Sequence, residues 1–135
     1  MKKISLIILC FLGILPIVAH ADWVELGGGK GSTLYLDPTK TASIDSSSKR
    51  AVILLSYEAI QKVPNGVPYQ SAISRIEADC RNLKFKFVAN FYYPEEMGKG
   101  DLNLSNNIPA HEQEWRYPAP NSAIENGINQ ICSKK

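Results

Sequence analysis

The sequence YQSAISRIEADC occupies residues 69–80 and, after Arg81-Asn82, the sequence LKFKFVANF occupies residues 83–91. Apolar and polar side chains alternate in both segments, which is typical of β-strands whose two faces differ. The second segment has the clearest alternation, because apolar side chains recur at every other position: Leu83, Phe85, Phe87, Ala89 and Phe91. The two segments therefore predict two strands joined by a short connection.

One face of the first of these strands carries mainly small side chains: Ala72, Ser74, Ile76, Ala78 and Cys80. Small side chains leave room for another element to pack closely against the sheet. A cysteine at the end of this row also offers a covalent attachment point for that element.

The end of the chain changes to a helical period. Residues 122–125, Ser-Ala-Ile-Glu, form a capping box that typically begins a helix. Three apolar side chains then recur at helical spacing, beside Cys132: Ile124, Ile128 and Ile131. Gly127 weakens such a helix by roughly 1 kcal/mol relative to alanine, and a helix this short is marginal alone. We therefore expect it to lie across the small-residue sheet face.

The first residues have the three parts of a secretory signal peptide. Lys2 and Lys3 precede an apolar run at residues 4–18, and Ala19-His20-Ala21 is a small-x-small cleavage site. The run is shorter than the roughly 20 residues that a membrane-spanning helix needs. We expect a signal peptide at residues 1–21 and one domain at residues 22–135, with no membrane span after cleavage.

Cys10 lies inside the apolar run, after Leu9, where a lipoprotein cysteine would follow a small residue at the end of the run. The sequence therefore predicts no lipid anchor. Cys80 and Cys132 are then the two cysteines left in an exported chain, and a disulfide between them is expected. A zinc site is the alternative, but two cysteines and one remaining histidine make a poor ligand set.

The chain has 15 lysines and arginines against 13 aspartates and glutamates. Lys2 and Lys3 leave with the predicted signal peptide, so the net charge of the remainder is near zero. Without a basic surface, nucleic acid is not an expected partner. The length suits one domain with one core.

Further strands are predicted at residues 23–26, 33–37, 50–61 and 112–117, with a short one at residues 41–44. Residues 50–61 are apolar on both faces near their start, which favours a central strand over the alternative of a buried helix. Residues 94–109 are polar and predict a loop or an irregular hairpin. The fold class is therefore α+β, with a C-terminal helix tethered to the sheet.

Three patterns resemble catalytic or metal motifs without completing them. His111-Glu112 lacks the second histidine of a zinc protease, because Trp115 stands four residues later. Residues 27–32, Gly-Gly-Gly-Lys-Gly-Ser, separate lysine from serine, so a flexible hairpin turn is favoured over a phosphate loop. Glu77 and Asp79 share a strand face. Paired carboxylates can do acid–base work or bind calcium, but they are more often a solvated strand face, here beside Arg75. We predict no enzyme, no cofactor and no metal.

Aromatic residues are enriched at protein interfaces. The best candidates for partner contact in this sequence are Tyr92, Tyr93, Trp115 and Tyr117. The alternative, which we favour, is that these rings pack in the core or on the sheet.

Several short motifs follow one another in a recognisable order: Trp23, Tyr35-Leu36-Asp37, Tyr69-Gln70-Ser71, Glu77-Ala78-Asp79-Cys80, Trp115, residues 118–122 and Cys132. This order resembles the surface-adhesin protein E family of Gram-negative bacteria over nearly the whole mature chain. The resemblance implies one antiparallel sheet of about six strands with a disulfide-held C-terminal helix. It also implies adhesion to host extracellular-matrix proteins such as laminin and vitronectin, and a homodimer.

The resulting functional hypothesis is an exported, non-enzymatic protein that binds a protein partner. Without a lipid cysteine, we expect it in the periplasm or secreted, with the cell surface as the location that the family resemblance implies. The alternative hypothesis is a periplasmic inhibitor of a hydrolase such as lysozyme, acting through the loop at residues 94–109, or an envelope accessory protein.

Overall fold

The computed structural model describes residues 22–133. The predicted signal peptide at residues 1–21 lies outside the described residues. The strands are β1 (Val24–Gly29), β2 (Ser32–Leu36), β3 (Ala42–Ser43), β4 (Ser48–Lys62), β5 (Pro68–Asp79), β6 (Lys84–Tyr93) and β7 (Leu104–Asn107). One α-helix, α1 (Ala123–Ser133), follows them, and the 3-10 turns are η1 (Pro38–Lys40), η2 (Glu96–Gly98) and η3 (Ala110–Glu112).

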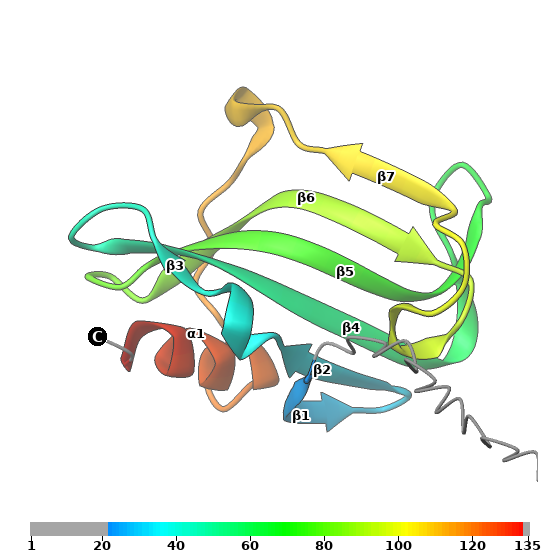
Figure 1. The fold of residues 1–135 in the computed structure, drawn as a ribbon, viewed down its shortest axis with the longest axis horizontal. Coiled ribbons are helices and arrows are strands. Elements are labelled where there is room, and N and C mark those ends of the chain that lie inside the picture. The colour runs from blue at the N-terminus through cyan, green and yellow to red at the C-terminus, as the bar shows by residue number, and fades with distance from the viewer. Residues whose placement is uncertain (1–21, 134–135) are drawn as a thin grey trace, which may run out of the picture.

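The strands form one antiparallel sheet in the order β1-β2-β4-β5-β6-β7, with β3 paired to β4. The sheet is curved, and α1 lies across one face, near β1, β2 and β4 (Figure 1). The α+β fold class, with one sheet and one C-terminal helix, is confirmed.

The glycine-rich segment is a hairpin, as the sequence predicts. Gly29 pairs with Ser32, so Lys30 and Gly31 form a two-residue turn between β1 and β2. Gly31 has φ +77°, which suits glycine at such a turn. The glycines do not end β1, because the strand continues through Gly29.

The helix buries its apolar stripe on the small-residue face. Ile128 and Ile131 are buried in one cluster with Ile76 and Ala78 of β5, and Ile124 packs partly against it. The cluster also contains side chains of β1, β2, β4 and β6: Leu26, Leu34, Leu36, Ala51, Ile53 and Phe85. Burial of this stripe stabilises a helix that would be marginal alone.

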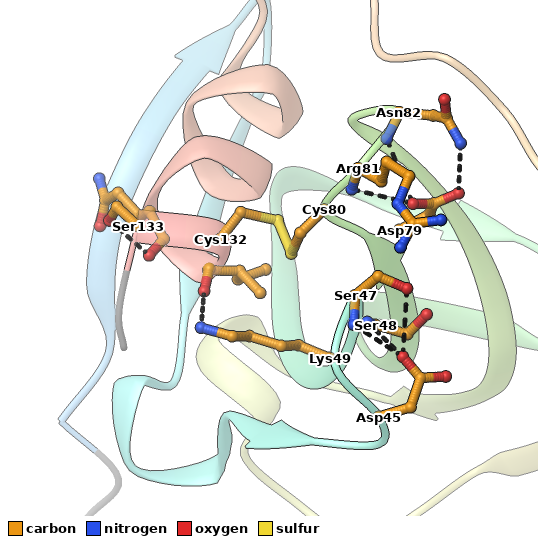
Figure 2. Close-up of a disulfide and its surroundings, with 12 residues drawn as sticks. Asp45, Ser47, Ser48, Lys49, Asp79, Cys80, Arg81, Asn82, Cys132 and Ser133 are labelled. Carbon is orange, nitrogen blue, oxygen red and sulfur yellow. Dashed lines mark hydrogen bonds between the residues drawn. A yellow bond between two sulfur atoms is a disulfide. The ribbon is translucent and has the colours of Figure 1, made fainter.

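The predicted disulfide is present. Cys80 and Cys132 have Cα atoms 5.3 Å apart and are separated by 52 positions in the sequence. Figure 2 shows the bridge joining the end of α1 to the end of β5, above the turn at Asp45 to Ser48. The Cys80 N–H donates to the Ser47 carbonyl at 2.8 Å, so this sheet corner is hydrogen-bonded as well as covalently tied.

The apolar row of β6 is interrupted by a β-bulge. Ile76 pairs with Phe87 but Arg75 pairs with Ala89, so Val88 is one extra residue on β6. The bulge reverses the faces beyond it, as an extra residue does in an antiparallel pair. Phe91 therefore lies on the face away from α1, where the Arg75 guanidinium is 5.2 Å from its ring centroid. The expectation that apolar side chains from Leu83 to Phe91 form one row on a single face is therefore wrong.

The strand expected at residues 112–117 is wrong, whereas the segment at residues 94–109 forms an irregular hairpin with β6, one of the two forms expected. Residues 112–117 do not form a strand: η3 covers the start, and Arg116 makes an isolated bridge with Phe85. The polar segment at residues 94–109 contains a short strand, β7, at the edge of the sheet. Hydrogen bonding between main chains determines whether each of these segments is a strand. The alternation of side chains does not indicate which main chains are paired.

The first part of that polar segment is fastened to the sheet face opposite α1. The buried Ser71 hydroxyl donates to the Glu95 carbonyl at 2.6 Å and accepts from the Gly98 N–H at 2.8 Å. The Ser56 hydroxyl accepts from the Met97 N–H at 3.1 Å. Two buried serines thus hold η2 against β4 and β5.

Candidate functional site

A groove of about 660 Å³ lies on the α1 face of the sheet, beyond the N-terminal end of the helix. The strands contribute Gly27, Gly28, Gly29, Ser32, Leu34, Ile53, Leu55, Tyr57, Tyr69, Ala72, Ser74, Phe85, Phe87, Asn90 and Tyr92. The start of the helix contributes Asn121, Ser122, Ala123 and Ile124. The groove is where the sheet extends past the end of its helical cover, and its size is within the range of ligand-binding sites.

Three tyrosines form one side of the groove. The ring centroids of Tyr57 and Tyr69 are 5.8 Å apart with an interplanar angle of 83°. Those of Tyr69 and Tyr92 are 4.8 Å apart with an angle of 68°. These are edge-to-face arrangements, which aromatic quadrupoles favour. The cluster links β4, β5 and β6 into a fixed aromatic wall.

The hydroxyl groups of Tyr57 and Tyr92 stay protonated at neutral pH. Burial, together with the interaction with Tyr69, raises the pKa of Tyr57 to about 12. The same two causes raise the pKa of Tyr92 above its ordinary value. The wall therefore offers neutral hydroxyls that can donate or accept hydrogen bonds.

A polar pair lies on the sheet surface that lines the groove. The Ser74 hydroxyl donates to Asn90 Oδ1 at 2.7 Å. Within residues 22–133, Asn90 Nδ2 has no hydrogen-bond acceptor. Asn90 and Tyr92 both follow the bulge at Val88, so this irregularity directs them to the groove face. Bulges commonly re-aim side chains in this way beside functional sites.

No aspartate, glutamate, lysine, arginine or histidine is among the described residues that line the groove. The described part of the chain also holds no group of three residues of the kind that binds a metal ion. The groove therefore combines apolar walls with neutral polar groups. Such a surface suits an uncharged ligand, because a charged one would lose hydration without meeting an oppositely charged side chain among these residues.

The four predicted contact residues are not gathered at one place. Tyr92 lies in the groove, whereas Tyr93 pairs with Ser71 and so belongs to the opposite face. Lys84 and Lys86 lie 5.3 and 4.8 Å from the ring centroid of Trp115.

Tyr117, 73% exposed, lines a smaller depression against α1 together with Leu83 and Ile128. A contact role for these four residues remains a prediction.

The two strand carboxylates are paired with neighbouring cations. Glu77 lies 3.7 Å from Arg50 and 3.5 Å from Lys86. Hydrogen bonds from Asn82, its side-chain amide first, lower the pKa of Asp79. These side chains form a partly buried face of paired charges, in which each carboxylate lies beside a lysine or arginine.

His111 is 80% exposed on its side chain, and its Nε2 atom is 3.5 Å from Glu112 Oε1. It belongs to η3, away from the residues of the groove. Its surroundings provide neither a metal site nor an adjacent nucleophile.

The sequence did not point to Tyr57, Tyr69, Ser74 or Asn90 as members of one site. Tyr57 could have been placed there, because it continues the buried row of Ala51, Ile53 and Leu55. Asn90 could not, because the sequence gives no sign of the bulge that reverses its face.

The sequence model of the family described as surface-adhesin protein E matches residues 23–133. No curated protein matches the sequence. In the described part of the chain, no helix has the length and apolar character needed to cross a bilayer.

Solved structures of protein E from Haemophilus influenzae are similar to this chain. One has a TM-score of 0.61 at 15% identity and covers 87% of this chain and 89% of its own. Another, from the non-typeable organism, has a TM-score of 0.61 at 16% identity, with 87% and 80% coverage. At these identities the likeness shows a shared fold.

Proposed function

Because the chain belongs to the surface-adhesin protein E family, we propose that it is an exported, non-enzymatic protein that binds a host extracellular-matrix protein. The family match indicates an adhesin-like surface protein. The observation that carries the protein-binding part is the uncharged aromatic groove beside α1. Binding sites are typically concave and apolar with a few placed polar groups, as here.

Export is the second part of this proposal. The signal peptide proposed at residues 1–21 would direct the chain across the inner membrane, and the domain at residues 22–135 would then oxidise its two cysteines. The disulfide supports this reading, because such bonds persist in oxidising compartments. The mature domain would then be periplasmic or released, or held at the surface by association.

The binding test uses the purified mature domain, residues 22–135, with its disulfide intact. We expect saturable binding to wells coated with laminin or vitronectin and none to wells coated with albumin. Size-exclusion chromatography of the same sample would test the homodimer that the family resemblance implies. Binding to neither matrix protein would contradict the host-partner proposal.

Location requires a separate measurement, because binding in a well does not show exposure on a cell. Cells that express the full chain would be treated with a protease that cannot cross the outer membrane. Loss of the domain from intact cells supports surface display. Protection until the outer membrane is opened supports a periplasmic location and counts against adhesion.

Inhibition of a hydrolase such as lysozyme remains the alternative proposal, with less support. An inhibitor that inserts a loop needs a protruding segment, and residues 94–109 are the candidate. Ser56 and Ser71 instead fasten η2, within that segment, to the sheet face. An assay of lysozyme activity with the mature domain would test this alternative directly.

A further inference from the structure

The groove has two chemical requirements that one ligand must meet together. Its walls are large apolar side chains such as Leu55 and Phe87, and these favour apolar groups on the ligand. Its polar groups are neutral, and Asn90 Nδ2 donates to no acceptor within residues 22–133. Covering that donor without supplying an acceptor would cost binding free energy.

These requirements disfavour several classes of ligand. A plain acyl chain would match the walls but would leave the side-chain amide of Asn90 dehydrated without a partner. A hydroxyl-rich sugar would present more polar groups than these mostly apolar walls can satisfy. A charged side chain would find no counter-ion among the described lining residues.

A peptide main chain with apolar side chains meets both requirements. Each amide unit supplies a carbonyl acceptor and an N–H donor without net charge. Asn90 Nδ2 can donate to such a carbonyl, and the hydroxyl of Tyr57 or Tyr92 can pair with the next amide unit. The walls can then hold the alternating side chains of an extended segment.

We infer that the groove between the tyrosine wall and the N-terminal end of α1 binds an extended, uncharged segment of a protein partner through one or two large apolar side chains. This inference rests on the proposed protein-binding function and adds the chemistry of the segment recognised. The side-chain amide of Asn90 donates a hydrogen bond to a main-chain carbonyl of that segment, and the bulge at Val88 places Asn90 on the groove face.

The test is a titration of the ¹⁵N-labelled mature domain, residues 22–135, with the pentapeptide acetyl-Ser-Leu-Tyr-Leu-Ser-amide. We expect the side-chain amide signal of Asn90 and the main-chain signals of Ala72 and Tyr92 to shift at millimolar peptide. The matched peptide acetyl-Ser-Asp-Tyr-Asp-Ser-amide should cause no such shifts. Chitotriose serves as a neutral sugar of similar size.

Two variants localise the binding. Ala72→Leu adds apolar volume on the groove face of β5 and should weaken binding of the neutral peptide about tenfold. Ala59→Leu makes the same change at an exposed position outside the groove and should leave binding unchanged. Circular dichroism and a thiol assay would confirm that both variants keep the fold and the disulfide.

A third variant addresses the polar pair. Ser74→Ala combined with Asn90→Leu removes both polar groups together, so neither is left unpaired. It should stay folded and lose the neutral peptide. Unchanged peptide binding in this variant would overturn the role of Asn90.

The inference is overturned if the neutral peptide shifts no groove signals, if it shifts signals only near Trp115 or β7, or if chitotriose alone occupies the groove. The matrix-protein assay on the same variants separates the two proposals. Equal matrix binding by the wild type and Ala72→Leu would support the adhesin function but would show that the groove is not the site that binds the matrix protein. Peptide binding without matrix binding would keep the groove and reject the host partner.

Discussion

The ammonium group of Lys49 in β4 donates a 3.0 Å hydrogen bond to the main-chain carbonyl of Ile131 in α1, 82 residues away (Figure 2). Carbonyls in the last turn of a helix lack intrahelical partners, and a positive charge there interacts favourably with the helix dipole. The end of α1 is therefore held twice, by the disulfide at Cys132 and by this bond.

Replacing this lysine tests the second attachment. Lys49→Met keeps the length of the aliphatic side chain and removes the charged donor, so the free energy of unfolding should fall by about 1–2 kcal/mol. Urea unfolding followed by circular dichroism would measure the change. Lys62→Met, at an exposed position of the same strand, is the control and should change stability little. Equal stability of the two variants would show that the bond contributes nothing.

Removal of the disulfide should have the larger effect. Cys80→Ala with Cys132→Ala frees a loop of 52 positions, and the chain-entropy model gives a loss of about 4 kcal/mol. Hydrogen exchange should also quicken at Ile128 and Ile131, because α1 would detach more often than the sheet unfolds. A double variant as stable as the wild type, with α1 still protected, would contradict this account.

The glycine inside α1 has a packing role that helix propensity does not reveal. A Cβ atom added to Gly127 would lie 2.8 Å from Cδ1 of Leu26, a buried side chain of β1. Helix propensity alone predicts that Gly127→Ala gains about 1 kcal/mol. We expect that gain only in a Leu26→Ala background, where the space is open.

A double-mutant cycle in urea measures this coupling. In the wild-type background, Gly127→Ala should be neutral or destabilising, because Leu26 must shift within the core. An equal gain in both backgrounds would show that close packing does not select glycine here.

The sequence predicted the elements whose signal is periodic. Alternation predicted β5 and β6, and the isoleucine stripe with its capping box predicted α1 and the face that it buries. The disulfide followed from two cysteines in a chain that we expect to be exported. Each of these signals depends on side chains that face the core, and those are the ones that composition constrains.

Most of the groove could not be predicted from the sequence, because its shape depends on an irregularity in the main-chain pairing of the sheet. The extra residue at Val88 places Asn90 on the groove face and Phe91 on the opposite face. The sequence gives no sign of this, because its apolar side chains still recur at every other position from Leu83 to Phe91. The polar strand β7 pairs through its main chain and carries no apolar pattern. Trp115 suggested a strand, but its ring lies beside Lys84 and Lys86.

Ser71 should be important for the position of η2. Its hydroxyl serves two main-chain groups, at Glu95 and Gly98, and is fully buried. Ser71→Ala leaves both groups without that partner and should lower the free energy of unfolding by about 2 kcal/mol. Hydrogen exchange at the Gly98 amide should quicken more than at Ile76. Unchanged exchange at Gly98 would contradict the anchoring role.

The tyrosine wall should make stability fall in strongly alkaline solution. The ordinary pKa of Tyr57 is 10.0, and the folded protein raises it to about 12 because burial and the neighbouring Tyr69 disfavour the phenolate. A raised pKa means that the neutral form stabilises the folded state. This contribution is fully present below pH 10.0 and is lost as the pH rises through about 12.

Urea unfolding of the wild type between these two pH values should therefore show a decline in stability that Tyr57→Phe reduces, because phenylalanine cannot ionise. Tyr117→Phe removes an exposed hydroxyl outside the groove and is the matched control. Ultraviolet absorbance of the phenolate should show one late-ionising tyrosine fewer in Tyr57→Phe. The same decline in wild type and Tyr57→Phe would show that ionisation of this wall is not linked to folding.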